Sequence, residues 1–389
     1  MTSSALTRPG QRDRVPVKFG EIDWTLSALI CLIAAAGGLM LYSIAGGSWK
    51  PWAGSQMLLF GLCFLLMMAL ALINLRVWFA LAYPVYGIAL VLLVLVMVVG
   101  HSALGAARWL QIGHLKFQPS EVMKMGLVMA LARFYHGLPA DRARLSWWLL
   151  IPLAMIGAPV LLIAKQPDLG TAILLAATGI AIMMLAGLSW RLILGAVAAA
   201  AIAAPGLIWA ILHGHLVKGY QAQRLLTFLH PEDDPSGAGY HILQAKIALG
   251  SGGFLGKGYG LGSQSQLDFL PEKQTDFIFA TLAEEFGFVG CASVLLLYAA
   301  VIVICLRVAS ISHSHFGRLA AAGVTATFAL YILINGAMVM GLAPVVGVPM
   351  PLLSKAGTVM TTVMIGFGLI QAVRVHRYEE VTSGSGAFM

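Results

Sequence analysis

Charged side chains are scarce in this sequence, and their scarcity argues against a water-soluble fold. They make up 10% of the 389 residues, whereas hydrophobic residues make up 59% and the mean hydropathy is +0.87. A soluble domain carries roughly 25% charged residues because its surface must face water. We therefore expect most of the surface of this chain to face lipid.

Cysteine is also scarce, and neither a disulfide framework nor a zinc site is predicted. The four cysteines, Cys31, Cys63, Cys291 and Cys305, all lie in apolar segments. None of them falls in a loop that we expect outside the membrane, and no Cys/His spacing is typical of zinc ligands. We interpret them as small packing residues.

Long apolar segments are present instead, and they predict an all-α integral membrane protein with about ten transmembrane helices. Each span needs about 20 apolar residues to cross a hydrocarbon core of roughly 30 Å, and helices pair every backbone polar group within the segment. The predicted spans are residues 25–45, 55–73, 78–99, 119–136, 147–164, 169–187, 192–212, 276–305, 318–342 and 351–373. Residues 1–24 and 376–389 are then tails, and 25–375 form one membrane domain. The apolar run after Trp24 is too long for a signal peptide, so we expect an uncleaved first span.

The distribution of Lys and Arg predicts the orientation, because cytoplasmic loops carry an excess of both. With cytoplasmic termini, the short outside loops hold only Lys50, Arg108, Lys116 and Lys165. The inside segments hold Arg8, Arg12, Arg14, Lys18, Arg76, Arg133, Arg142, Arg144, Arg191, Arg307, Arg318, Arg374 and Arg377. We therefore expect a multi-pass protein of the cytoplasmic (inner) membrane with both termini inside. The net charge of +8 then reflects topology and attraction to anionic lipids, and no nucleic-acid partner is expected.

One long polar loop, residues 213–275, is expected on the outer face between the seventh and eighth spans. Loops of this length are uncommon in compact proteins and are usually functional. The stretch from Tyr240 to Leu249 has the spacing of an amphipathic helix that could lie along the membrane interface. The following "GSGGFLGKG" loosely resembles a phosphate-binding loop. It lacks the strand–turn–helix setting of such loops, so a flexible turn is the favoured alternative.

Ionisable residues at the ends of spans are candidate functional groups, because each is costly in lipid. Gln118, Glu121 and Lys124 follow each other at intervals of three, so neighbouring pairs fall on one helix face. A purely structural Glu121–Lys124 ion pair is the alternative. Lys165 and Asp168 lie where the fifth predicted span meets the sixth, and Asp168 could instead cap a helix.

A second set of polar and ionisable groups lies at the start of the eighth and the last predicted spans. Asp276 stands at the outer mouth of the eighth span, where a helix cap is again the alternative. Glu284 and Glu285 lie two turns deeper, and at least one of them is expected to be structural. Ser354 and Lys355 open the last span.

Five stretches resemble, in order and spacing, the motifs of the SEDS family of membrane glycosyltransferases. They are "GAARWLQIGHLKFQPSEVMK", "AKQPDLGTA", "HPEDDPSGAGYHILQAKIALGSGGFLGKG", "SQLDFLPEKQTDFIFATLAEEFGFVG" and "PVVGVPMPLLS". The resemblance covers about residues 25–375, and its fourth and fifth motifs look like those of members that act in cell elongation. One departure is visible: the family usually has Ser-Tyr-Gly-Gly where this chain reads Ser354-Lys355-Ala356-Gly357.

The resemblance implies polymerisation of lipid II on the outer face, with release of undecaprenyl pyrophosphate, during lateral wall elongation and maintenance of rod shape. Asp276 would be the catalytic general base, since one carboxylate suffices for an inverting transfer. Arg108, Gln118, Glu121, Lys124, Asp168, Arg224 and Lys246 would bind the substrate, the cations by offsetting the charge of the pyrophosphate. Asp168 is also a candidate for holding a divalent cation, Mg²⁺ or Mn²⁺.

Partners follow from the same resemblance. The sequence carries no nucleophile motif for cross-linking, so a class B penicillin-binding protein is expected beside it, together with MreC, MreD and MreB. Two other classes of function remain open: a flippase for a lipid-linked saccharide, and a scaffold that only recruits partners. A flippase needs charged groups through the whole membrane depth, whereas here they gather at the outer mouth and outer loop.

Overall fold

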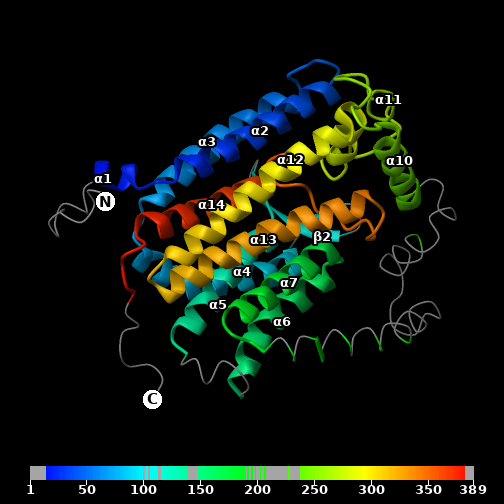
Figure 1. Cartoon of the computed structure of the whole chain (residues 1–389). Coiled ribbons are helices and arrows are strands. Elements are labelled where there is room, and N and C mark those ends of the chain that lie inside the picture. The colour runs from blue at the N-terminus through cyan, green and yellow to red at the C-terminus, as the bar shows by residue number, and fades with distance from the viewer. Residues whose placement is uncertain are drawn as a thin grey trace.

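The computed structural model describes residues 15–99, 101–103, 106–112, 115–138, 147–189 and 237–381, with single residues between 191 and 227. Within this part of the chain, helices dominate (Figure 1). They are α1 (Val15–Gly20), α2 (Trp24–Ile44), α3 (Ala53–Ala71), α4 (Leu75–Val99), α5 (Pro119–His136), α6 (Leu150–Lys165), α7 (Leu169–Leu185), α10 (Ala238–Ser251), α11 (Ser263–Gln266), α12 (Ile278–Ile311), α13 (His315–Val339) and α14 (Gly357–Val375). A short 3₁₀ turn, Trp147–Leu149, precedes α6.

The predicted all-α membrane fold is confirmed, and nine of the ten predicted spans coincide with a helix. Among the described residues, seven helices are long and apolar enough to cross a membrane, and α7 is a shorter apolar one. The helix α5 carries three charged residues, Glu121, Lys124 and Arg133, and is therefore less apolar. The predicted span 192–212 lies largely outside the described residues.

The last predicted span begins later than expected, at Gly357 instead of residue 351. Pro344, Pro349 and Pro351 precede it, and each proline removes a backbone donor and disfavours helix in the residue before it. Residues 343–356 consequently form an extended and turning segment between α13 and α14.

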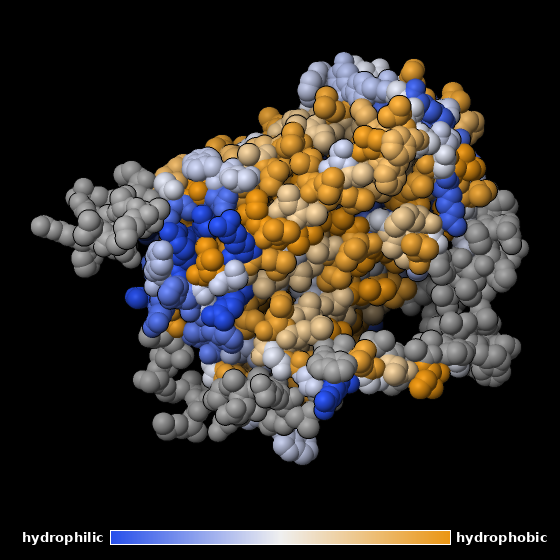
Figure 2. All heavy atoms as spheres, in the orientation of Figure 1, coloured by the Kyte–Doolittle hydropathy of each residue, from blue (hydrophilic) through white to orange (hydrophobic). Residues whose placement is uncertain are grey.

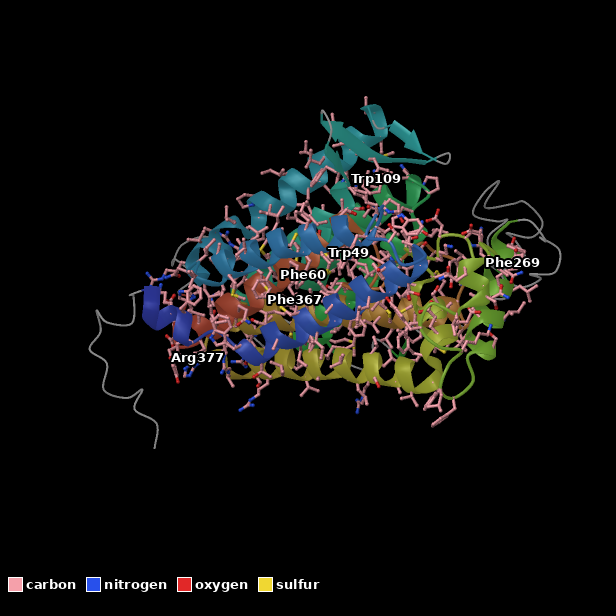
Figure 3. The ribbon with its side chains drawn as sticks, turned by 90° about the horizontal axis from the view of Figure 1, so that it is seen from above. Trp49, Phe60, Trp109, Phe269, Phe367 and Arg377 are labelled. Carbon is pink, nitrogen blue, oxygen red and sulfur yellow. The ribbon has the colours of Figure 1, made fainter. Side chains whose placement is uncertain are left out.

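A small antiparallel sheet was not predicted. Its strands are β1 (His101–Ala103), β2 (Ala106–Ile112) and β3 (Leu115–Phe117), in the order β1-β2-β3. It lies in the connection between α4 and α5, and Figure 3 shows Trp109 of β2 at the edge of the bundle. The strands are too short to give a clear alternating pattern in the sequence.

The interior of the bundle is formed by α5, α13 and α14, most of whose residues are buried. Small residues allow close contact between these helices, as is common in membranes. A Cβ added at Gly323 of α13 would lie 2.9 Å from side-chain atoms of both Ile182 and Val128. Gly366 of α14 is similarly close to Val324. The helices that carry the site are thus held by tight packing.

The two described ends of the chain lie at the same end of the bundle. Arg377 and Glu21 form an ion pair of 2.5 Å, and Gln371 hydrogen-bonds the backbone of Asp23. The helices α10 and α11 lie at the opposite end (Figures 1 and 3). Figure 2 shows polar surface at both ends and a hydrophobic band between them, as expected for a protein embedded in a bilayer.

Candidate functional site

Asp276 lies in the turn just before α12 and is partly exposed. The N-cap of α12 is Phe277, which makes no side-chain capping hydrogen bond, so the alternative that Asp276 is the N-cap residue is wrong. The backbone carbonyl of Asp276 accepts a hydrogen bond of 2.8 Å from Asn335 Nδ2. Its carboxylate faces Gly347, since a Cβ added there would lie 3.6 Å from Asp276 Oδ2.

The turn that leads to Asp276 is braced by a buried lysine. Lys273 is 7% exposed, and its ammonium donates to the carbonyl of Ser265 and lies 2.5 Å from Asp268 Oδ1. This hydrogen bond lowers the pKa of Asp268 below its usual value. The Lys355 N–H donates to the carbonyl of Gln274 at 2.9 Å. Residues 265–276 are therefore fixed by contacts within the turn and by a contact from Lys355, just before α14.

Glu121 and Lys124 form the buried ion pair that their spacing allows. Lys124 Nζ lies 2.6 Å from Glu121 Oε1, and the two residues are 2% and 4% exposed. Lys124 also contacts the hydroxyl of Tyr331, and its ammonium lies 4.6 Å from the centre of that ring. The Tyr331 hydroxyl is 3.2 Å from Glu121 Oε2. The structural alternative is confirmed as a contact, and a role in substrate binding remains a prediction.

Asp168 is connected by a hydrogen bond from Gln118 to the helix that carries Glu121 and Lys124. As the sequence allowed, it is the N-cap of α7, and its Oδ1 accepts from the N–H of Thr171 at 3.4 Å. Its second oxygen accepts from Gln118 Nε2 at 3.3 Å. Because Gln118 precedes α5 directly, this contact ties the start of α7 to the helix that carries Lys124.

Residues 340–356, here termed the α13–α14 segment, connect several of these groups. A Cβ on Gly170, two residues after Asp168, would lie 2.4 Å from the carbonyl oxygen of Val346. Gly347 faces Asp276, and the Val348 carbonyl accepts a hydrogen bond of 2.8 Å from Asn335. The segment thus brings the starts of α7 and α12 to one place.

The remaining predicted cations are placed less fully. Lys246 is exposed on α10, where its Cε would lie 2.0 Å from a Cβ added at Gly341, so it borders the α13–α14 segment. Arg108 belongs to β2, and the structure describes its backbone only. Arg224 lies outside the described residues.

Tyr331 and Asn335 are site residues that sequence reasoning missed. Both are polar residues inside the predicted span 318–342, and both are buried. Neither carries a charge at neutral pH, so the cost of burying charge in lipid does not single them out. A tyrosine and an asparagine one helical turn apart in an apolar segment were a usable signal, because buried polar groups in membranes are costly unless they are paired.

The glycine-rich stretch forms the predicted turn, which packs against α12, and it is not a phosphate loop. Residues 252–258, here termed the glycine loop, insert into a break in α12 at Gly287, where φ is +62° and ψ is −158°. The N–H groups of Lys257 and Gly258 donate to the carbonyls of Glu284 and Glu285 at 2.9 and 3.0 Å. Because those donors are occupied, they cannot hold a phosphate. The preceding stretch forms α10, which confirms the predicted helix.

Glu284 and Glu285 both have structural contacts. Glu284 is fully buried, pairs with Lys257 Nζ at 2.7 Å and accepts from the backbone N–H of Gln264 at 3.0 Å. Glu285 accepts a hydrogen bond of 2.5 Å from Ser43 of α2. These contacts tie the glycine loop and α2 to the short first part of α12, the helix that follows Asp276.

The arrangement defines a polytopic membrane protein with a partly exposed carboxylate, Asp276, and a buried, charge-paired lysine, Lys124; α13 contacts the backbone of the first and the ammonium of the second. A family model described as a cell cycle protein, covering FtsW, RodA and SpoVE, matches residues 23–379. The chain belongs to this family, as its motifs predicted.

Individual relatives agree with this assignment. The chain is 41% identical over 362 residues to the peptidoglycan glycosyltransferase MrdB of Escherichia coli K12, covering 92% of this chain and 94% of that protein. It is similar to a chain of a peptidoglycan synthase complex that coordinates polymerisation and crosslinking, with a TM-score of 0.79, 32% identity and coverage of 92% and 99%. It is also similar to the rod shape determining protein RodA of Thermus thermophilus, with a TM-score of 0.69, 29% identity and coverage of 92% and 98%. The predicted likeness to elongation-type members is confirmed.

Proposed function

We propose that this protein is a peptidoglycan glycosyltransferase that polymerises lipid II into glycan strands and releases undecaprenyl pyrophosphate. The similarity to MrdB over nearly the whole chain supports the reaction class. The observation that carries the mechanism is the position of Asp276. It precedes the N-cap residue of α12, and its carboxylate faces the α13–α14 segment. An inverting glycosyl transfer requires one such carboxylate as the base, and we assign this role to Asp276.

The reaction needs one proton acceptor. The 4-hydroxyl of the acceptor saccharide attacks the anomeric carbon of the donor, the bond to the pyrophosphate breaks, and the hydroxyl proton passes to the Asp276 carboxylate. The pyrophosphate leaves with the electron pair of the broken bond. The braced turn around Lys273 and Gln274 holds the carboxylate in place before substrate arrives, which lowers the entropic part of the barrier.

Cations near the site would offset the charge of the departing pyrophosphate. The Lys124 ammonium has three N–H groups, of which Glu121 and Tyr331 take two. We propose that the third binds a phosphate oxygen, while Glu121 holds the lysine in its rotamer. Arg108, Arg224 and Lys246 are proposed as further contacts, and Gln118 and Asp168 as groups that organise the neighbouring backbone.

A divalent cation is proposed only as a companion of the substrate. The described residues hold no group of three His, Cys, Asp or Glu side chains that could ligate a metal ion. Both oxygens of Asp168 already accept hydrogen bonds. Each oxygen keeps a free lone pair, so Asp168 could still supply one ligand, and Mg²⁺ or Mn²⁺ would take its other ligands from the pyrophosphate oxygens and water.

The setting of the reaction is proposed from topology and from the synthase relative. We infer that the termini are cytoplasmic, that the loop 213–275 and Asp276 face the outside, and that a class B penicillin-binding protein cross-links the product. Similarity to a complex of polymerisation and crosslinking supports such a partner. Association with MreC, MreD and MreB during elongation is part of the same proposal.

The decisive experiment is Asp276→Asn in a lipid II polymerisation assay with purified protein. Asparagine is nearly isosteric with aspartate but cannot accept the proton, so we expect a rate loss of roughly 10²–10⁴-fold. Asp276→Glu, which moves the carboxylate by one methylene, should also retain little activity because base catalysis depends on geometry.

The matched control is Glu380→Gln, which makes the same change from carboxylate to amide at an exposed residue after α14, at the other end of the bundle. It should melt and polymerise like the wild type. A near-normal rate for Asp276→Asn would contradict the assignment and reopen the flippase alternative.

A further inference from the structure

Asn335 of α13 holds two separate backbone segments with one side chain. It is fully buried, and its Nδ2 donates to the carbonyl of Asp276 at 2.8 Å and to the carbonyl of Val348 at 2.8 Å. Both neighbours are acceptors, so the nitrogen of the amide must face them. The two contacted residues belong to the turn before α12 and to the α13–α14 segment.

The other end of this amide argues against a role in stability alone. Asn335 Oδ1 is buried and has no hydrogen-bond partner among the described residues. A buried acceptor without a partner destabilises a fold, so this amide is not arranged for stability at both ends; an apolar residue would avoid that cost but would take away the donor of the Asp276 and Val348 carbonyls. What only an amide can supply here is a pair of donors for two carbonyl groups that lie close together.

The position of these carbonyls links Asn335 to the reactive carboxylate. Asp276 precedes the N-cap of α12, so the direction of its side chain depends on backbone contacts of the turn rather than on helix geometry. Its carboxylate faces Gly347, which is next to Val348. Tyr331, one turn earlier on α13, contacts Lys124. The helix α13 therefore contacts both the turn that carries Asp276 and the buried lysine.

We propose that Asn335 is a positioning residue, which sets the place of the Asp276 carboxylate relative to the α13–α14 segment and to the Lys124 cluster. The proposal rests on the proposed function, in which Asp276 is the general base. A displacement of about 1 Å in such a group can cost about 10²-fold in rate. The effect should fall on kcat rather than on KM, because Asn335 itself does not need to touch substrate.

The test is Asn335→Asp in the full-length protein, assayed with varied lipid II. The change keeps the size of the side chain but turns an acceptor toward two carbonyl oxygens. We expect kcat to fall about 10- to 100-fold with KM within about threefold of the wild type. The ratio of its rate to the wild-type rate should rise between about pH 8 and about pH 6, because a protonated carboxyl again donates one hydrogen bond. Asn335→Ser, with one shorter donor, should lie in between.

The matched control is Gln371→Met at the opposite end of the bundle. Gln371 is also a fully buried amide that bonds the backbone of an aspartate, with 2.9 and 3.0 Å contacts to Asp23. It should lower the melting temperature without changing kcat or the pH profile. A wild-type kcat in Asn335→Asp, or an equal kcat loss in Gln371→Met, would overturn the proposal. If Asn335→Asp fails to insert, Asn335→Ser decides by its kcat and KM alone, and failure of both would make Asn335 structural.

Asp276→Asn, assayed in parallel, separates this proposal from the proposed function. If Asp276→Asn is active, the assignment of Asp276 as the general base is wrong. If Asp276→Asn is inactive while the Asn335 variants have the wild-type kcat, only the positioning role of Asn335 is wrong.

Discussion

Lys124 keeps its charge inside the bundle because two different elements supply partners. Glu121 comes from the same helix three residues earlier, and this pairing could be predicted from spacing alone. Tyr331 lies on another helix, 207 residues later in the sequence, and no local pattern could predict that contact. The same division holds for Asp168, whose cap of α7 is local and predictable, whereas its contact with Gln118 is not.

The buried pair gives a prediction about stability and activity together. Lys124→Met leaves Glu121 as an uncompensated buried charge, which typically costs about 3–5 kcal/mol. The single variant should therefore lose both melting temperature and polymerisation. Adding Glu121→Gln removes the stranded charge, so the double variant should regain stability while remaining inactive if Lys124 binds the pyrophosphate.

The comparison variant is Lys257→Met, which strips a lysine from another buried carboxylate, Glu284. Glu284 keeps its hydrogen bonds from Ser263 and Gln264, so the loss of stability should be smaller and the rate per folded molecule unchanged. Full activity in the Glu121→Gln/Lys124→Met double variant would leave only a structural role for the pair.

Among the elements, α12 shows how far an apolar run can predict structure. Its length and hydropathy predicted a span, but not the break at Gly287 or the glycine loop that fills it. The N–H groups of Phe288 and Val289 donate to Gly253 and Phe254 across this break at 3.0 and 3.1 Å. The sequence displayed the glycines, yet their partner lies about thirty residues away, so local patterns favoured a flexible turn.

The break predicts which glycines tolerate alanine. A Cβ on Gly256, whose φ is +83°, would lie 2.1 Å from the carbonyl oxygen of Glu285. Gly256→Ala should therefore destabilise the protein by at least about 1–3 kcal/mol and lower its melting temperature. Gly250 belongs to the same motif but lies in α10 with open space around it. Gly250→Ala should be neutral or stabilising by up to about 1 kcal/mol. Equal melting temperatures for the two variants would contradict the proposed packing of the glycine loop.

At the scale of the whole molecule, charge and packing divide the protein into two ends. Arg377 and Glu21 meet at the end where α1 and the last helix lie, while Gln266 and Tyr259 bond the backbone of α2 at the other end, near Asp276. Hydropathy could predict the spans, and the Lys/Arg count could predict an orientation. Neither could predict the α13–α14 segment as the meeting place of the site, because that depends on contacts between distant helices.

The orientation itself gives the last prediction, tested with single cysteines that a membrane-impermeant thiol reagent can reach. Ser48 is exposed in the connection between α2 and α3, at the end that carries Asp276. Ser310 is exposed near the end of α12, where the His313 N–H bonds the carbonyl of Arg377. Because Lys and Arg concentrate at the Arg377 end, that end should be cytoplasmic. Ser48→Cys should therefore be labelled in intact cells, once any outer membrane is permeabilised, and Ser310→Cys only after lysis. The unmodified protein is the control, since its own cysteines are buried or half-buried. Labelling of Ser310→Cys alone in intact cells would reverse the orientation and move Asp276 to the cytoplasmic side, where it could not act on substrate at the outer face.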